Sequence, residues 1–382
     1  MNTQKVDFAI IGGGVTGLWL NALLTRTGFS TVVIEKRALG GEQTLASQGM
    51  IHGGVKYSLS GLVNNHFDTL KGMPDRWMKC LSGDDSVDLR NVKILSPRYY
   101  MFSDESLSSK LVTFLGSLLL RSHVSPVKSA DFPKAFNNPK FKGNLYELKD
   151  IVIDTKSLVE NLTRGFETRI VKGHPEIVCK EGRISSLIID GKYRVEAEKY
   201  ILAAGVGNQK IINTVEIPLE MQNRPLHQVV IRGENLPDLF AHAVSIRDLS
   251  KPRITFTTHI LDRYKYWYLG GELAESGVKR TSLDQIKFAK EELKNILPWI
   301  DFSECKFSTF KIDRAEPKSK KNLKPTKAFV RFYKNTIVCW PTKLALTPQL
   351  GDDVLSNIFT KPNLGPKLFP AERPEIGKIP WI

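Results

Sequence analysis

The sequence is poor in cysteine and has no long, uninterrupted apolar run. Its four cysteines are widely scattered and form no CxxC pair: Cys80, Cys179, Cys305 and Cys339. This spacing argues against a zinc site and against a disulfide framework, and it favours a reducing compartment. Any redox chemistry would therefore come from a bound cofactor, and we predict no metal site.

The apolar stretches do not resemble membrane spans or a secretory leader. Residues 111–120, LVTFLGSLLL, number only ten, too few to cross a bilayer, so a buried helix is expected and a monotopic membrane contact is the alternative. Four glycines interrupt the early apolar segment FAIIGGGVTGLWL, unlike the apolar region of a signal peptide. We expect a cytoplasmic protein, with peripheral contact to the inner membrane as the variant.

Size, apolar content and charge are the positive features of the composition. A chain of 382 residues with 41% hydrophobic and 25% charged residues is expected to fold as two domains, or as one domain with a large insertion. Lysine and arginine exceed aspartate and glutamate by 55 − 40 = 15. This excess favours an anionic substrate, a phosphate-bearing cofactor, an anionic lipid surface or nucleic acid, unless it is simply a solvated basic surface.

The first part of the chain has the pattern of a dinucleotide-binding βαβ unit. Residues 6–11, VDFAII, predict a buried strand, a helix follows as far as Gly28, and residues 31–35, TVVIE, predict the next strand. Gly12, Gly14 and Gly17 between them have G-x-G-x-x-G spacing. These glycines permit a tight turn, a close approach of backbone to a pyrophosphate, and helix packing on the strand. The predicted fold class is therefore α/β and Rossmann-like.

An acidic residue and a long loop narrow the choice of cofactor. Glu35 ends the second strand, where a carboxylate can accept hydrogen bonds from ribose hydroxyls and would repel a 2′-phosphate; this indicates FAD or NAD rather than NADP. An NAD dehydrogenase would continue with alternating strands and helices. Here the strand leads instead into KRALGGEQTLASQGMIHGGVKYSLSG, and such a long loop requires a function.

Four segments resemble the FAD-dependent oxidoreductases of the D-amino-acid oxidase and glycerol-3-phosphate dehydrogenase superfamily. ASQGMIHGGVKYSL resembles the run beside the isoalloxazine, with Ser47 and Gln48 as donors to the pyrophosphate or flavin. IVIDTKSLVENLTRGF resembles the segment before the adenine-side strand, and YRVEAEKYILAAGVGNQKI the second flavin fingerprint, with Gly205. CWPTKLALTPQLGDDVLSNI resembles the C-terminal flavin segment, with Leu344, although Pro341 and Thr342 replace glycines.

The resemblance implies FAD as cofactor and a division into two domains. Residues 1–75, 150–215 and 310–382 would form the FAD-binding domain. Residues 76–149 and 216–309 would combine into a discontinuous substrate domain with an antiparallel sheet, α+β overall. No second GxGxxG occurs in the middle third of the chain, so a separate NAD domain is not expected and the reductant would enter as substrate.

Three residues are catalytic candidates on this resemblance. His52 would hydrogen-bond the substrate hydroxyl or amine, or take its proton as hydride leaves; the alternative is a histidine that satisfies loop carbonyls. Lys343 would stabilise negative charge on the reduced flavin or bind an anionic substrate, unless it is a surface lysine. The guanidinium of Arg314 suits a carboxylate or phosphate, or forms a structural ion pair with Asp313 or Glu316.

The substrate pocket is predicted from aromatic and histidine side chains. Tyr57, His259 and Tyr268 are the substrate-binding candidates, and His227 and Tyr266 are further possibilities, although single aromatics at strand spacing also fit a core. The lysine-rich segment 316–327 is interpreted as a solvated loop, a lid for an acidic substrate, or a patch for RNA or an anionic membrane. Nucleic acid is not the expected partner, because no RNA-binding module and no aromatic interleaving are present.

These features together predict an FAD-dependent oxidoreductase. It would remove hydride from a CH–OH or CH–NH carbon of a small anionic substrate, such as a 2-hydroxy acid or glycerol phosphate, and pass electrons to oxygen, a quinone or another acceptor. The alternative within enzymes is an amine or D-amino-acid oxidase. Outside that class stand a basic, RNA-associated flavoprotein and a flavin-binding protein without turnover.

Overall fold

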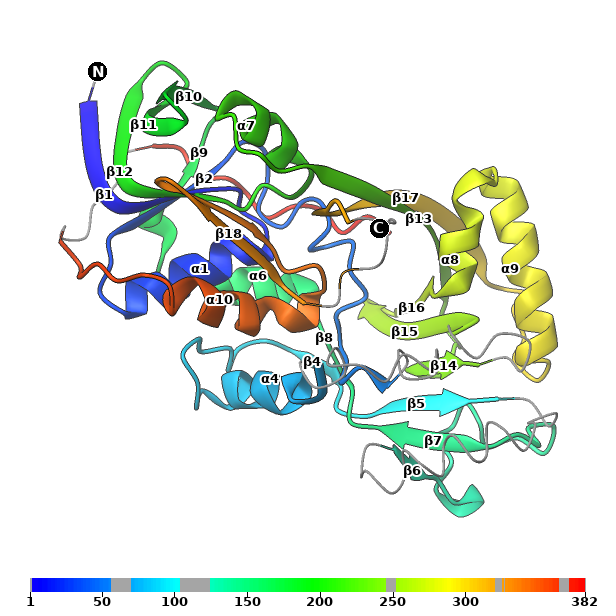
Figure 1. Cartoon of the computed structure of the whole chain (residues 1–382). Helices are drawn as coiled ribbons and strands as arrows, with labels where there is room; N and C mark the ends of the chain where they lie inside the picture. The colour runs from blue at the N-terminus through cyan, green and yellow to red at the C-terminus, as the bar shows by residue number, and fades with distance from the viewer. Residues whose placement is uncertain are drawn as a thin grey trace.

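The computed structural model describes residues 2–55, 70–103, 124–244, 252–319, 325, 327–363 and 371–381. This part of the chain contains two large β-sheets and a small one, with helices on their outer faces (Figure 1). The same described residues include no helix with the length and hydropathy needed to span a membrane. The apolar stretch 111–120 and Tyr57 lie outside the described residues.

The first sheet is built around a central parallel strand. β1 pairs in parallel with β12 on one side and with β2 on the other, and β9 continues in parallel beyond β2. The buried apolar run of β1 is typical of a strand that is covered on both faces. The strands of this sheet are β1 (Asn2–Ile11), β2 (Thr31–Glu35), β9 (Ile170–Lys172), β10 (Pro175–Lys180), β11 (Arg183–Ile189), β12 (Tyr193–Leu202), β18 (Phe329–Tyr333) and β19 (Thr336–Trp340).

Helices cover both faces of the first sheet, as a Rossmann-like α/β fold requires. On one face, α1 (Val15–Arg26), α6 (Thr155–Thr163) and α10 (Thr347–Leu355) share an apolar core with β1 and β2. On the other face, α7 (Asn208–Thr214) contributes buried residues to a second core. The predicted α/β class is therefore confirmed, and the strand predicted at residues 31–35 coincides with β2.

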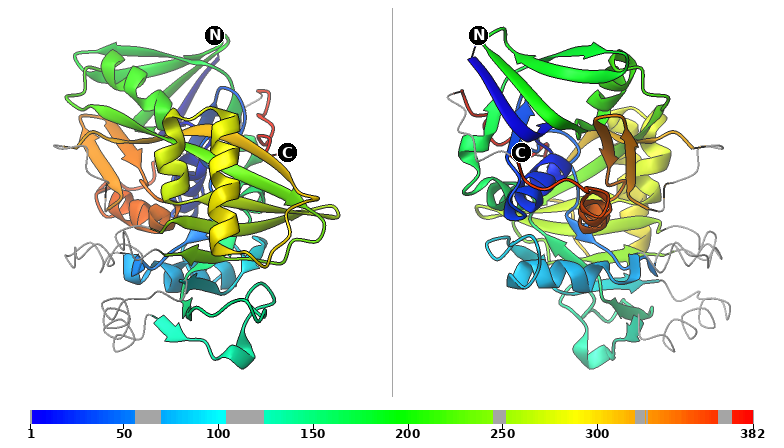
Figure 2. Two further views of the ribbon diagram at one scale, coloured as in Figure 1. Left: turned by 90° about the vertical axis from the view of Figure 1, so that its right-hand side faces the viewer. Right: turned by 60° about the vertical axis from the view of Figure 1, so that its left-hand side comes forward.

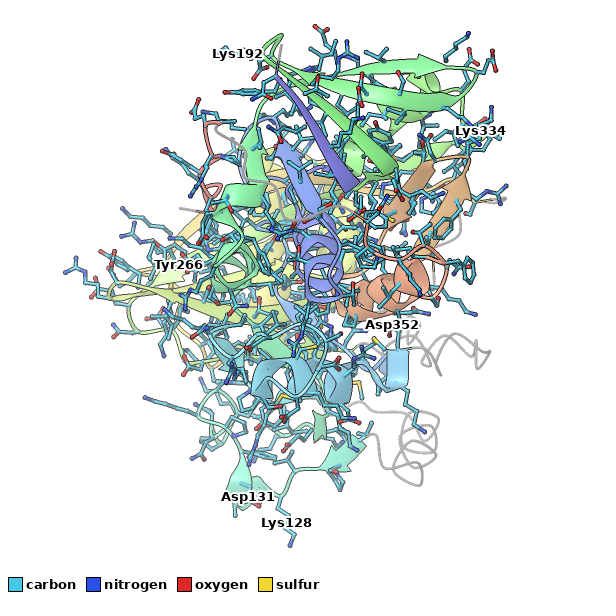
Figure 3. The ribbon with its side chains drawn as sticks, turned by 90° about the vertical axis from the view of Figure 1, so that its left-hand side faces the viewer. Lys128, Asp131, Lys192, Tyr266, Lys334 and Asp352 are labelled. Carbon is cyan, nitrogen blue, oxygen red and sulfur yellow. The ribbon has the colours of Figure 1, made fainter. Side chains whose placement is uncertain are left out.

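α4 (Met73–Ser82) packs against the helical layer of the first sheet. The rings of Trp19 in α1 and Trp77 in α4 lie 5.3 Å apart between centroids. Asp352 of α10 points toward α4 (Figure 3), and its carboxylate accepts hydrogen bonds of 3.2 Å from the guanidinium of Arg76. These contacts join residues far apart in sequence into one helical layer.

The second sheet is antiparallel apart from one pair and follows the order β17-β13-β16-β15-β14-β5-β7-β6. Two helices, α8 (Glu272–Ser276) and α9 (Ser282–Ile296), lie on one side of it (Figure 2). Trp267 and Leu269 pack toward these helices, whereas their neighbours Tyr266 and Tyr268 belong to a different cluster on the opposite face. The strands are β5 (Tyr99–Phe102), β6 (Val124–Pro126), β7 (Leu145–Leu148), β13 (Met221–Gly233), β14 (Ala241–Ala243), β15 (Ile254–Leu261), β16 (Tyr264–Gly270) and β17 (Lys306–Pro317).

The strands of a small third sheet fall, along the sequence, between strands of the first large sheet and strands of the second. This small sheet consists of β3 (Met50–Ile51), β8 (Ile151–Ile153) and β4 (Ile94–Ser96), all antiparallel. Strands from the predicted FAD-binding ranges form the first sheet, and strands from the predicted substrate ranges form most of the second. β17 begins at Lys306, before the predicted boundary at residue 310, and the domain division itself stays a prediction.

Candidate active site

The turn between β1 and α1 is closely packed, and this packing requires glycine at two positions. Gly12 has φ +114°, and a Cβ there would lie 2.5 Å from the Ala203 carbonyl oxygen. A Cβ on Gly17 would lie 1.9 Å from the Gly12 carbonyl oxygen. A Cβ on Gly14 would meet Thr44 Oγ1 at an ordinary 3.4 Å. Contacts within the protein therefore leave room for a side chain at Gly14. A glycine at this position is explained if the open space is filled by a pyrophosphate beside the helix N-terminus.

The loop after β2 folds back onto this turn. Thr44 Oγ1 accepts a hydrogen bond of 3.0 Å from the first backbone N–H of α1, that of Val15. The backbone N–H of Gly40 donates to the Gly13 carbonyl at 2.9 Å. Loop residues 39–46 thus form one wall of the cradle at the start of α1, and Thr44 is a residue that the motif did not reveal.

Glu35 lies beside the glycine turn, at the position where the motif places the ribose-binding acid. Its two carboxylate oxygens accept hydrogen bonds from the backbone N–H groups of Gly13, at 2.7 Å, and Arg37, at 2.8 Å. Because each carboxylate oxygen has about two lone-pair positions, both retain capacity to accept from ribose hydroxyls. These backbone bonds also fix the orientation of the carboxylate.

The segment that carries Ser47 and Gln48 joins the two large sheets. Ser47 Oγ accepts from the backbone N–H of Gly49 at 3.1 Å. Gln48 Nε2 donates to the carbonyls of Tyr268, at 2.8 Å, and Thr255, at 3.2 Å. A Cβ on Gly270 would lie 2.4 Å from Gln48 Oε1 and would displace the Gln48 amide. Gln48 therefore fastens the loop to the second sheet, and its predicted direct bond to the cofactor stays a prediction.

His52 follows β3 and is 5% exposed. The next residue, Gly53, donates its backbone N–H to Asp150 Oδ1 at 2.8 Å, and Asp150 immediately precedes β8, the partner strand of β3. A buried carboxylate thus fixes the turn that carries His52. Sequence analysis did not reveal Asp150, because it lies 97 residues away in the chain and belongs to no motif.

Lys343 and Leu344 lie next to the His52 segment, because β3 contacts the 3₁₀ turn η5 (Leu344–Leu346) that opens α10. The Lys343 ammonium group donates to the Pro325 carbonyl. Thr342 has φ +61°, a left-handed conformation that a β-branched residue rarely adopts. The chain therefore keeps at Thr342 a backbone shape suited to the glycine that the family resemblance leads one to expect there.

Gln43 in the loop after β2 links Gly205 with the strand that carries Arg314. Gly205 has φ +56° and lies near Gln43, whose side-chain oxygen accepts from the backbone N–H of Ala315 at 3.0 Å. The neighbouring Arg314 forms an ion pair of 3.5 Å with Glu275 of α8. This partner differs from the two anticipated from sequence, Asp313 and Glu316; Glu316 pairs instead with Arg224 at 3.4 Å.

The predicted substrate residues His259 and Tyr268 are covered by Trp381. Ring centroids lie 4.9 Å apart for His259 and Trp381, and 4.8 Å apart for Tyr268 and Trp381. The Tyr268 hydroxyl donates to the Ala46 carbonyl, so contact with a substrate would require that bond to break. His227 lies on the helix-covered face, where its ring nitrogens contact the Gly277 carbonyl and the Thr309 hydroxyl. Tyr266 packs in the cluster that contains Tyr268 and Trp381.

Burial of His259 makes the stability of the fold sensitive to pH. Burial lowers the pKa of His259 from 6.5 to about 4, because the charged ring would lose its hydration, although Asp154 opposes this shift. Between pH 4 and 6.5, His259 therefore binds a proton in the unfolded chain but not in the folded chain. We expect the free energy of unfolding to fall as pH drops from 6.5 to about 4, by about 3 kcal/mol from this residue.

Urea unfolding at several pH values would measure this contribution. Replacing His259 with glutamine is expected to flatten the pH dependence across the interval between pH 4 and 6.5. The matched control is His174→Gln, because His174 is exposed. Equal slopes for wild type and His259→Gln would show that the histidine is not held neutral.

The site combines a glycine turn at the start of α1, an acidic residue at the end of β2, and a loop after β2 that is hydrogen-bonded to the second sheet. These are the features of a dinucleotide-dependent oxidoreductase. The family model of the FAD-dependent oxidoreductases, DAO, matches residues 7–306. The chain belongs to this family of FAD-dependent enzymes.

Individual relatives agree with the family assignment. The probable FAD-dependent oxidoreductase PA4991 of Pseudomonas aeruginosa is 39% identical over 386 residues, covering 99% of this chain and 97% of that protein. Its crystal structure matches with a TM-score of 0.87 at 34% identity, covering 100% of this chain and 98% of that one.

More distant solved structures share the fold. Glycine oxidase from Geobacillus kaustophilus matches with a TM-score of 0.68 at 14% identity, over 94% of this chain and 97% of that one. L-α-Glycerophosphate oxidase from Mycoplasma pneumoniae, with FAD bound, matches with a TM-score of 0.67 at 14% identity, over 99% and 100%. The predicted family and its cofactor, FAD, are confirmed by the family model and the 39% identical relative.

Proposed function

We propose that this enzyme removes hydride from a CH–OH or CH–NH carbon of a small anionic substrate, such as a 2-hydroxy acid, glycerol phosphate or an amino acid. The observation that supports this best is the position of Arg314 on β17. Its side chain is 27% exposed. The backbone N–H of the next residue, Ala315, donates a hydrogen bond to Gln43 in the loop that forms the cofactor cradle. A guanidinium in that position suits a carboxylate or phosphate.

The protein's own groups would orient the substrate and move its proton. Arg314, oriented by Glu275, would hold the anionic group. His52, buried and placed by the turn at Asp150, would take the proton from the hydroxyl or amine. Lys343 would stabilise negative charge. FAD, when bound, supplies the hydride acceptor.

Anaerobic addition of a substrate panel to the purified protein tests this proposal. The panel contains 2-hydroxy acids, amino acids, simple amines and glycerol 3-phosphate, and bleaching of the flavin absorption identifies the substrate class. Mixing the reduced protein with oxygen or a soluble quinone then identifies the acceptor. Bleaching by simple amines, which carry no anionic group, but by no panel member with a carboxylate or phosphate, would contradict the proposal.

Arg314→Ala is expected to raise KM for the bleaching substrate by roughly 10- to 100-fold, because a charged hydrogen bond contributes about 1.5–3 kcal/mol. FAD content should be unchanged, and Arg314→Lys should recover only part of the loss, since lysine lacks the planar fork. The exposed Arg331 of β18 provides the control for loss of one positive charge. An Arg314→Ala enzyme with unchanged KM would show that Arg314 does not bind the substrate and that its contacts with Glu275 and Arg224 are structural.

A further inference from the structure

Residues 371–381, the last described segment, run alongside the loop of residues 39–46 that forms one wall of the cradle. The backbone N–H of Leu39 donates to the Glu375 carbonyl at 2.8 Å, and that of Gly377 donates to the Leu39 carbonyl at 2.9 Å. Leu39 and Ile376 form a parallel bridge. This pairing extends the loop with a short piece of β-structure that comes from a distant part of the chain.

Close packing accompanies the backbone pairing. A Cβ on Gly377 would lie 2.6 Å from the Cα of Gly41 and 3.1 Å from Leu45 Cδ1, so the two backbones are in direct contact. The loop between Leu39 and Ala46 is therefore held between the glycine turn, through Gly40 and Thr44, and residues 371–381.

Both ends of the segment are anchored to the rest of the fold. At one end, the backbone N–H of Lys172 in β9 donates to the Glu372 carbonyl at 2.7 Å, and the two side chains form an ion pair. At the other end, Trp381 is 9% exposed and lies against Tyr268, whose hydroxyl is bonded to Ala46. In Figure 1 the red segment accordingly runs from the first sheet to the second.

We propose that residues 371–381 form a strap whose docking is thermodynamically coupled to FAD binding. The strap pairs with Leu39 and packs on Gly41, in the same loop whose Gly40 and Thr44 hydrogen-bond to the turn at the start of α1. Ordering that loop is part of the cost of binding the pyrophosphate, and a docked strap lowers this cost. Coupling of this kind is reciprocal, so bound FAD must also stabilise the docked strap.

Gly377→Ala tests the coupling directly, because its methyl group would push the strap and Gly41 apart without changing the identity of any cradle residue. We expect FAD to bind the apoprotein of this variant about 5- to 100-fold more weakly, within the usual range of such couplings. Quenching of flavin fluorescence during titration of the apoprotein gives the affinity. Gly72→Ala is the matched control, because a Cβ at Gly72 meets nothing within 4 Å.

Hydrogen–deuterium exchange measures the reciprocal effect without any catalytic readout. Adding FAD to the wild-type apoprotein is expected to slow exchange in the peptide covering residues 371–381. The coupling would be refuted by exchange in this peptide that does not respond to FAD. An unchanged FAD affinity in a Gly377→Ala protein that exchanges faster there would refute it equally.

A second pair of variants covers the case in which Gly377→Ala does not fold. Trp381→Ala removes the anchor on Tyr268, whereas Trp299→Ala removes a large side chain that packs on Phe141 against the core of the second sheet. Both should lower the melting temperature, but only Trp381→Ala should also weaken FAD binding. Equal FAD affinity in the two variants would show that Trp381 contributes stability alone.

Discussion

Replacing Gly17 with alanine is expected to give a colourless, destabilised protein. The new methyl group would lie 1.9 Å from the Gly12 carbonyl oxygen, so α1 must move away from β1. Such overpacking costs about 3 kcal/mol, and it shifts the N-terminal amides of α1 that would face the pyrophosphate. The absorption spectrum of the purified protein and its thermal unfolding in the absence of FAD measure the two effects.

Gly14→Ala separates cofactor binding from packing. Its methyl group meets only Thr44 Oγ1, at 3.4 Å, among the described atoms. The apoprotein should therefore unfold at nearly the wild-type temperature, while FAD binding is lost because the methyl group occupies the space for the pyrophosphate. Normal FAD content in this variant would place the pyrophosphate elsewhere.

Replacing His52 with alanine is expected to slow flavin reduction by about 10²- to 10⁴-fold, the usual contribution of a positioned proton acceptor. FAD content should stay normal, because the cradle at the start of α1 does not include this ring. Anaerobic stopped-flow absorption with the substrate identified by the panel gives the rate. The loss should narrow as pH rises, because hydroxide increasingly replaces the missing proton acceptor.

Added imidazole distinguishes catalysis from a structural role of His52. A proton acceptor lost from the site can be replaced in part by imidazole, so the rate for His52→Ala should rise with imidazole concentration. A histidine that only satisfies loop carbonyls would leave the rate of flavin reduction nearly unchanged on replacement. That result would move the search for the base to other residues around the second sheet.

Local sequence signals were sufficient for the βαβ unit. Gly12, Gly14, Gly17 and Glu35 could be placed because strand, turn and helix are contiguous, and their mutual geometry follows from backbone conformation alone. β1 begins at Asn2, earlier than the predicted strand at residues 6–11, because its first residues pair with the start of β12. That extension depends on a partner strand remote in sequence, which no local pattern records.

Contacts between distant segments explain what sequence analysis could not supply in the site. Gln48 was interpreted as a cofactor ligand, and its attachment to the second sheet depends on space above Gly270. Asp150 and Trp381 carry no motif, and their roles emerge only when β8 meets β3 and the last segment reaches Tyr268. Arg314 forms an ion pair with Glu275, which could not be foreseen from its sequence neighbours because α8 brings Glu275 to it from another element.

The order of strands in the first sheet also determines when the enzyme can acquire its cofactor during synthesis. β1 is made first, yet its neighbour β12 ends at Leu202, and β12 in turn pairs with β19, which ends at Trp340. Because such non-local pairing is slow and leaves strand edges exposed, we expect the emerging chain to be prone to aggregation until β19 has been made. We therefore expect loading with FAD to follow the synthesis of β19.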